Sequence, residues 1–279
     1  MPALVHADQV GGFNMLVLDS PANRNALSLQ LLNELTEQVS PSGTGPGRGL
    51  VLTHTGTTFC SGVDLRERRS LGDADTSHSR LLGELLVKLW KYPKPIVTVV
   101  SGAVRGGGMG LLACSDIVIA APDSTFAYSE TRVGVAPALV MAVTLPAVVG
   151  RPMLAPLLTG AVFDAHKARE LGLVTAIDDQ PVRGIVRKIV TELSAGAPEA
   201  QAAVKRLLRA TQNVDIDRLI TAMIAESAAQ FRSAEAHEGM AAFAERRPPN
   251  WKRSGLEFAA ERATYEASPT ISDIHESRR

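Results

Sequence analysis

The chain has 279 residues, 45% of them hydrophobic, and its 29 basic and 29 acidic side chains give a formal net charge of zero. This composition supports a large buried core. Without a basic excess or an apolar run of roughly 18 residues, we expect neither a nucleic-acid partner nor a membrane span. Two cysteines in a chain of this size, and no signal-peptide pattern, predict a cytoplasmic protein, and the scattered histidines predict no metal site.

Short runs rich in β-branched residues alternate with helical patterns in the first half of the chain. The runs predict strands at residues 13–18, 50–53, 96–100 and 117–120. Leucines that share one face predict helices near residues 31–39 and 81–89, the second with Ser77 as its N-cap. Strands that alternate with helices indicate an α/β unit with much parallel pairing.

The second half is mostly helical. Asp164 is expected to cap a helix that ends before Gly172, Pro198 to lie near the start of another, and residues 215–246 to be helical by propensity. A helical segment attached to an α/β core suggests a lid or an oligomerisation element. We therefore divide the chain into a core, a helical region and a polar tail, at residues 1–195, 196–252 and 253–279.

Two glycine-rich segments, residues 58–65 and 101–111, each follow a predicted strand. Glycines allow the backbone to approach a ligand closely, and free N–H groups at a helix start attract negative charge. Two such groups aimed at one point would bind the oxyanion of an enolate formed from a thioester. The alternative for the second segment is tight packing of a helix on a sheet. Its loose dinucleotide-binding pattern, Gly108 to Ala113, leaves too short a helix before the strand at Ile117.

A series of segments, in this order, resembles the crotonase (enoyl-CoA hydratase/isomerase) superfamily: 23–27, 59–65, 106–117, 126–137, 159–174 and 238–243. The resemblance implies an α/β crotonase spiral of β-β-α repeats with a C-terminal helical trimerisation and lid region. It implies a homotrimer or a hexamer that acts on an acyl-CoA or enoyl-CoA thioester. CoA would arrive as part of the substrate, with no separate cofactor.

The same resemblance assigns the site. The backbone N–H groups of Val63 and Gly107 would hold the thioester oxygen, and Glu130 would be the acid/base. Substrate-binding positions would be Arg24, Ala26, Ser61, Gly62, Asp64, Leu65, Arg66, Gly106, Gly108, Gly110, Ser129 and Phe243.

Several of these assignments have alternatives. Arg24 and Arg66 would lie near the CoA adenine and phosphates, or be solvated surface arginines. Phe243 would cover the pantetheine or pack in the core. Asp64 is interpreted as a cap for its loop more than as a catalyst, and Glu130 could instead pair with Arg132.

One position departs from the family pattern. Hydratases of the family commonly carry two glutamates, and Gly110 stands where the first is expected, which leaves Glu130 as the single carboxylate. In this respect the chain resembles a methylglutaconyl-CoA hydratase-like subgroup, in which a glycine also stands at this position. Three hypotheses follow: a 2-enoyl-CoA hydratase, a 3,2-enoyl-CoA isomerase that needs only one carboxylate, and a catalytically silent acyl-CoA-binding protein.

Overall fold

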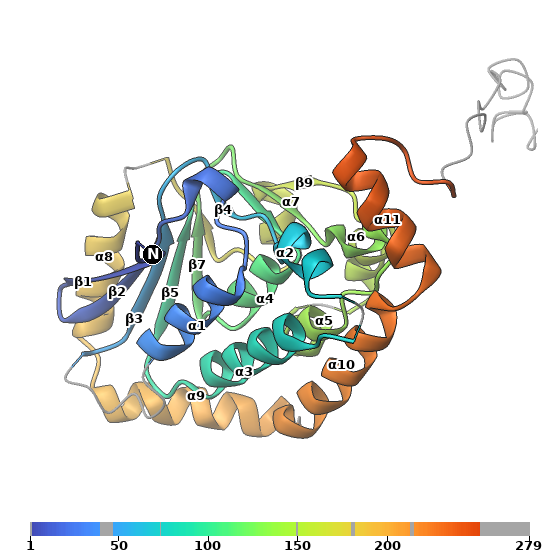
Figure 1. Cartoon of the computed structure of the whole chain (residues 1–279). Helices are drawn as coiled ribbons and strands as arrows, with labels where there is room; N and C mark the ends of the chain where they lie inside the picture. The colour runs from blue at the N-terminus through green and yellow to red at the C-terminus, as the bar shows by residue number, and fades with distance from the viewer. Residues whose placement is uncertain are drawn as a thin grey trace, which may run out of the picture.

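The computed structural model describes residues 2–39, 47–72, 74–148, 150–179, 182–212 and 215–251, and the predicted tail, residues 253–279, lies outside this range. Two sheets form the centre of the molecule (Figure 1). The six-stranded sheet has the order β1 (Val5–Val10), β2 (Phe13–Leu18), β3 (Leu50–His54), β5 (Ile96–Val100), β7 (Ile117–Ala120) and β10 (Ala176–Ile177). The four-stranded sheet has the order β4 (Thr58–Cys60), β6 (Ala103–Arg105), β8 (Thr125–Ala127) and β9 (Phe163–Asp164).

The chain alternates between the two sheets. β3, β5 and β7 lie side by side in the large sheet, and the strands that follow them, β4, β6 and β8, lie side by side in the small one. These pairings are parallel, whereas β1–β2 and β8–β9 are antiparallel. All four predicted strands occur in the large sheet, and the spiral of β-β-α repeats is confirmed. The short strands of the small sheet were not predicted, because two or three residues carry no periodic signal.

The helices and 3-10 turns complete the fold. They are η1 (Pro21–Asn23), α1 (Leu29–Gln38), α2 (Leu65–Ser70), α3 (Ser77–Lys91), α4 (Gly107–Ala113), η2 (Ser129–Val133), α5 (Ala138–Ala147), η3 (Arg151–Met153), α6 (Leu154–Thr159), α7 (Ala165–Glu170), α8 (Val182–Ser194), α9 (Pro198–Gln212), α10 (Ile216–Phe231) and α11 (Ala234–Glu245). Asp164 caps α7 by accepting the Lys167 N–H at 2.8 Å, as predicted. The N-cap of α3 is Thr76 and not Ser77, which is the first helical residue.

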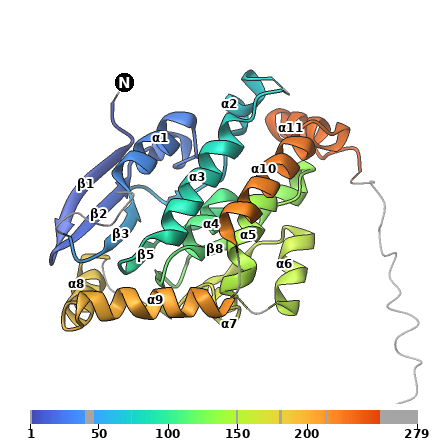
Figure 2. The same ribbon diagram turned by 90° about the horizontal axis from the view of Figure 1, so that it is seen from below.

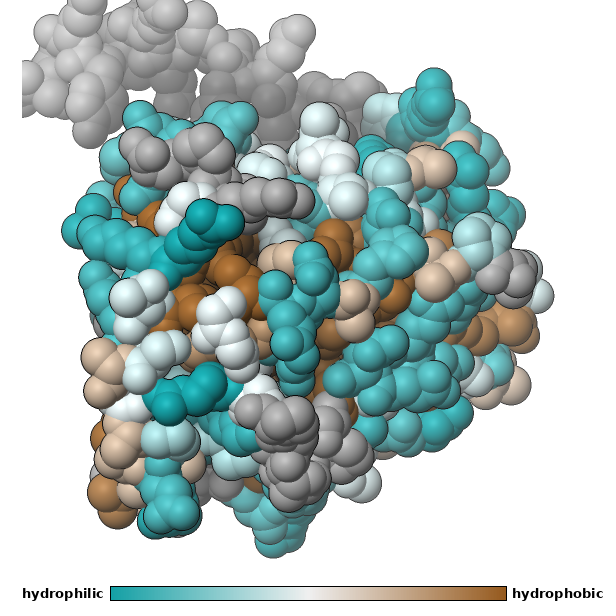
Figure 3. Space-filling view, turned by 90° about the vertical axis from the view of Figure 1, so that its left-hand side faces the viewer, coloured by the Kyte–Doolittle hydropathy of each residue, from teal (hydrophilic) through white to brown (hydrophobic). Residues whose placement is uncertain are grey.

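The central strands β3, β5 and β7 of the large sheet are buried on both faces: successive side chains point to opposite faces, and each face packs into an apolar cluster. Leu50 and Leu52 face the main core with α1 and α3, whereas Val51 faces the opposite way, against α8. On the side of the molecule that carries β1, β2 and α8, apolar side chains are visible between hydrophilic ones (Figure 3). This double burial explains why β3, β5 and β7 are almost continuously hydrophobic, whereas the exposed edge strand β1 is not.

The helical region is divided where the sequence predicted continuous helix. α10 ends at Phe231, and Ser233 starts α11 by accepting the Ala236 N–H on Oγ at 3.1 Å. α10 lies beside α3 and α5, and α11 turns toward α2 and η2 (Figure 2). No described helix is long and apolar enough to cross a membrane. The turn between α10 and α11 brings α11 against α2 and η2, the elements that follow β4 and β8 in the chain.

Candidate active site

The first glycine-rich segment is fixed by a β-bridge between Leu27 and Val63. Leu27 donates its N–H to the Gly62 carbonyl at 2.8 Å, and its carbonyl accepts the Asp64 N–H at 3.3 Å. In a parallel bridge these two bonds come from the neighbours of Val63, so the N–H of Val63 itself points away from Leu27. Within the described part of the chain, that N–H donates to no acceptor.

The second segment turns sharply at Gly106, where φ is 49° and ψ is −121°, a backbone conformation that suits glycine alone. The N–H of Gly106 is bound by the Ala127 carbonyl at 3.2 Å. Gly107 then begins α4, so its N–H has no acceptor within the helix. A Cβ on Gly62 would lie 3.7 Å from Gly106 Cα, so the two segments are in contact. Their free N–H groups therefore border one cavity.

Glu130 lies in η2, directly against the second turn. A Cβ on Gly106 would be 3.4 Å from Glu130 Oε1. Although part of the residue is exposed, its Oε2 is enclosed and has no hydrogen-bond partner among the described residues. Burial raises the pKa of this carboxyl from 4.5 to about 7, against a small opposing effect of its own backbone N–H. Arg132 does not pair with it: its Nε donates to the Thr159 carbonyl at 3.3 Å.

A cavity of about 340 Å³ is lined by Val63, Gly107 and Glu130 together. Of the residues assigned from sequence, Ser61, Gly62, Leu65, Gly106, Ser129 and Phe243 also line it. Most of its remaining wall is apolar, from α3, α5, α10, α11 and the loop before α5, and includes Leu82, Val135, Leu139, Val140, Phe231 and Ala242. A carboxylate with a pKa near neutrality, in an apolar cavity beside oxyanion-binding groups, is equipped for proton transfer next to a carbonyl.

Two further spaces adjoin this cavity. One, of about 600 Å³, is bordered by arginines from three elements: Arg24, Arg66, Arg69 and Arg246. The other, of about 220 Å³, is lined by Ala26 and Asp64 among others. Leu65 and Phe243 border all three spaces and so connect them. The side chain of Phe243 is 55% exposed, which contradicts its alternative role in the core.

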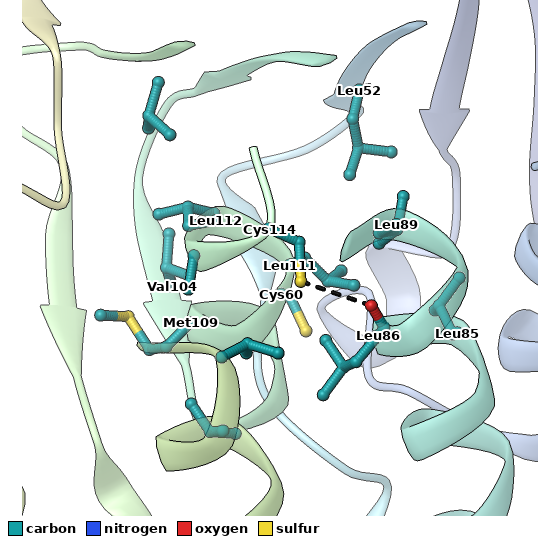
Figure 4. Close-up of a cluster of buried hydrophobic side chains, with 14 of the residues drawn as sticks. Leu52, Cys60, Leu85, Leu86, Leu89, Val104, Met109, Leu111, Leu112 and Cys114 are labelled. Atoms are coloured by element: carbon teal, nitrogen blue, oxygen red, sulfur yellow. Dashed lines mark hydrogen bonds between the residues drawn. The ribbon is translucent and has the colours of Figure 1, made fainter. Parts of the chain in front are cut away.

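Gly108 and Gly110 lie outside the lining of these spaces. A Cβ on Gly108 would be 2.7 Å from Cys60 Cβ, and one on Gly110 would be 3.1 Å from Leu86 Cδ2. Both glycines thus allow α4 to pack closely against its neighbours, in the apolar cluster that Figure 4 shows around Leu86 and Met109. Cys60 is inert in this cluster, since burial raises the pKa of its thiol to about 12. The packing interpretation of the glycine-rich helix therefore holds for these two positions.

Asp64 has the structural role that was expected. Its Oδ1 accepts the N–H groups of Arg66 at 3.0 Å and Glu67 at 3.1 Å, and so caps α2. This cap fixes Asp64, which directly follows Val63, at the N-terminus of α2.

Several lining residues escaped the sequence analysis: His78, Ser79 and Ser227 on the cavity wall, and Arg69 and Arg246 at the surface. No motif marks them. One signal was available for the histidine, which precedes Leu82 by four residues and so interrupts the apolar face of α3 with a polar group. Of the described residues, no group of three or more His, Cys, Asp or Glu side chains could hold a metal ion.

Known proteins with this fold identify the family. The sequence profile of the enoyl-CoA hydratase/isomerase family matches residues 10–254. A solved enoyl-CoA hydratase from Mycobacterium avium is 38% identical, with 90% of this chain and 100% of that chain covered and a TM-score of 0.80. One from Shewanella pealeana is 30% identical, with coverage of 89% and 96% and a TM-score of 0.71. A mevalonyl-coenzyme A hydratase from Aspergillus fumigatus is 28% identical over 248 residues, 87% of this chain and 92% of that protein. The chain therefore belongs to the enoyl-CoA hydratase/isomerase family.

Proposed function

We propose that the protein adds water across the double bond of a 2-enoyl-CoA. The observation that carries this proposal is the enclosed Glu130 carboxylate, which lies against the Gly106 turn beside two free backbone N–H groups. Such N–H groups stabilise the negative charge that develops on a thioester oxygen. A single carboxylate with a pKa of about 7 is able both to accept and to return a proton near neutral pH.

The reaction then proceeds with one carboxylate. The thioester oxygen accepts hydrogen bonds from the Val63 and Gly107 N–H groups, which draws electron density from C3 of the substrate. Glu130 removes a proton from water as the water oxygen bonds to C3, and the enolate charge rests on the thioester oxygen. The protonated Glu130 returns that proton to C2, so that one water is added and the carboxylate is restored. Gly110 takes no part, which agrees with the resemblance to the methylglutaconyl-CoA hydratase-like subgroup.

The pH dependence of hydration tests this assignment. Because the ionised Glu130 is the base, kcat/KM for crotonyl-CoA is expected to rise about tenfold per pH unit in the acid range and to level off above a pKa of about 7. The loss of enoyl-thioester absorbance measures the rate. A profile that is flat between pH 5 and pH 8, or that falls as the pH rises through this range, would contradict the role of Glu130 as base.

The arginines at the surface are suited to the phosphates of CoA. We expect the double substitution Arg24→Ala, Arg66→Ala to raise KM for crotonyl-CoA by about tenfold at low salt, with a smaller effect at high salt. The pantetheine thioester, which lacks the nucleotide, should show no such change. Arg80→Ala is the control, because Arg80 pairs with Glu84 outside all three spaces. An equal rise in KM for both thioesters would indicate a folding defect and not a loss of phosphate binding.

A 3,2-enoyl-CoA isomerase is the second candidate, and the surroundings of Gly110 favour it. The space around that position is occupied by Leu86 and Val140, and among the described residues that line the cavity Glu130 is the one carboxylate. A proton shift between C4 and C2 needs only one. Conversion of 3-enoyl-CoA without any hydration of crotonyl-CoA would favour the isomerase. A catalytically silent binding protein would convert neither thioester.

We also propose that the chain forms the homotrimer or hexamer that the family resemblance implies. Large apolar side chains on and near α6 support self-association, because Leu154, Leu158 and Val162 are 49%, 73% and 56% exposed.

A further inference from the structure

One part of the acyl cavity is polar. His78 and Ser79 reach it from α3, and Ser227 reaches it from α10. All three side chains are buried, with 1%, 5% and 8% of their surface exposed. They interrupt a wall that is otherwise made mainly by apolar side chains, so any substrate chain that extends along α3 meets them.

The position of His78 places it beyond the reacting carbons. Leu82 touches the oxyanion turn, since a Cβ on Gly107 would lie 3.2 Å from Leu82 Cδ2. His78 precedes Leu82 by one helical turn, about 6 Å along the helix axis. An acyl chain held at Gly107 by its carbonyl would therefore bring its fourth or fifth carbon toward His78.

The hydrogen bonds of His78 determine which of its nitrogens is free. Its Nε2 lies 3.0 Å from Glu67 Oε2, an oxygen that also accepts the Leu29 N–H at 2.9 Å. A carboxylate only accepts, so Nε2 bears the hydrogen. Burial lowers the pKa of the ring, which favours its neutral form. Nδ1 is then a bare acceptor, and it is buried without a partner among the described residues.

The two serines supply the complementary group. Ser79 Oγ and Ser227 Oγ lie 2.9 Å apart, so one hydroxyl donates to the other. The pair has two hydrogens and uses one in this bond, which leaves one to donate. His78 and the serine pair thus offer one acceptor and one donor to a group in the cavity.

We propose that this polar wall, made by His78, Ser79 and Ser227, selects an acyl chain that carries a hydroxyl group two or three carbons beyond C2. A hydroxyl both donates and accepts, which matches the wall. A carboxylate does not, because it cannot donate to Nδ1 and because Glu67 places a negative charge behind the ring. Of the cavity's arginines, Arg247 already binds Glu238 at 2.6 and 3.0 Å. This inference rests on the proposed hydration of enoyl-CoA thioesters.

The test compares 2-pentenoyl-CoA with 5-hydroxy-2-pentenoyl-CoA, which differ only in the hydroxyl. The full chain is expected to hydrate the hydroxylated thioester with a kcat/KM about tenfold higher, because the wall's buried polar groups stay unpaired with the other substrate. In Ser79→Ala, Ser227→Ala and in His78→Phe this preference should fall to about one. Replacing both members of a hydroxyl pair has little effect on stability, which keeps the serine variant folded.

A second hydroxyl pair provides the matched control. Thr98 Oγ1 and Ser115 Oγ lie 2.7 Å apart and outside the acyl cavity, so Thr98→Val, Ser115→Ala should leave the preference unchanged. Equal kcat/KM for the two thioesters in the wild-type protein would overturn the inference and leave the hydratase proposal intact.

Binding separates the inference from turnover. Calorimetric titration with pentanoyl-CoA and 5-hydroxypentanoyl-CoA should show the same tenfold preference in Kd. If neither enoyl thioester is hydrated but this binding preference exists and is lost in the variants, the polar wall is supported and the hydratase proposal fails. If the two Kd values are equal, the wall holds only water and the inference is wrong.

Discussion

Glu130→Gln is expected to lower kcat for crotonyl-CoA by about 10³-fold, because an amide of the same shape cannot accept the proton from water. The thioester should bind the variant about as well as it binds the wild type, since the oxyanion groups of Val63 and Gly107 and the apolar wall are unchanged. Loss of enoyl-thioester absorbance measures the first effect, and calorimetric titration with butyryl-CoA measures the second. Glu84→Gln, at an exposed position on α3, is the control.

The outcomes separate the hydratase from the silent binding protein. Hydration by the wild type alone supports the one-glutamate hydratase. Equal hydration by both proteins would remove Glu130 from the mechanism. Binding without conversion of crotonyl-CoA or 3-enoyl-CoA by either protein would favour the silent acyl-CoA-binding protein.

The same variant should be more stable than the wild type at alkaline pH. The folded-state pKa of Glu130 is raised from 4.5 to about 7, so the folded protein binds this proton more tightly than the unfolded chain does. The free energy of unfolding of the wild type therefore falls, relative to that of the variant, as the pH rises from about 4.5 to about 7. The difference should reach roughly 3 kcal/mol above that range and vanish below it. Urea unfolding at pH 4 and pH 8 tests this sign.

Gly106→Ala is expected to lower kcat by at least about 10²-fold, the usual effect of losing one oxyanion-hole donor. At a φ of 49° and a ψ of −121° the alanine would be strained. Its Cβ would lie 3.4 Å from both Glu130 Oε1 and Gly62 Cα, at the lower limit of ordinary van der Waals contact, which leaves it no room to spare. Relief of the backbone strain moves the turn that aims the Gly107 N–H. Steady-state kinetics with crotonyl-CoA measures the loss.

Gly72→Ala separates backbone strain from damage to the site. Gly72 also has a positive φ, of 79°, but a Cβ there would meet nothing within 4 Å. The free energy of unfolding of this control should fall by about 1 kcal/mol, as expected when an alanine is forced into a positive φ. Its kcat should be unchanged. If both variants retain full activity, the Gly106 turn does not position the oxyanion-binding group.

Much of the fold was predictable because its signals are local. The central strands β3 and β5 of the large sheet are mainly aliphatic runs, since burial on both faces leaves few polar positions. The caps of α7 and the start of α9 follow from Asp164 and Pro198, whose preferences act within one turn. The division between α10 and α11 at Ser233 was missed, because high helix propensity on both sides obscured a single capping residue.

The sequence by itself determined the order of the motifs, and with it the family, the two glycine turns and Glu130 as the single candidate acid. Which residues share the cavity is visible in the folded chain alone, because it depends on contacts between segments far apart in the sequence. The fold brings Ser227 to Ser79 and places Phe243 at the opening. It also assigns Gly108 and Gly110 to helix packing, because the space beside each is filled by a side chain from another element. The raised pKa of Glu130 likewise could not be predicted from the sequence, since burial is a property of the folded chain and not of any motif.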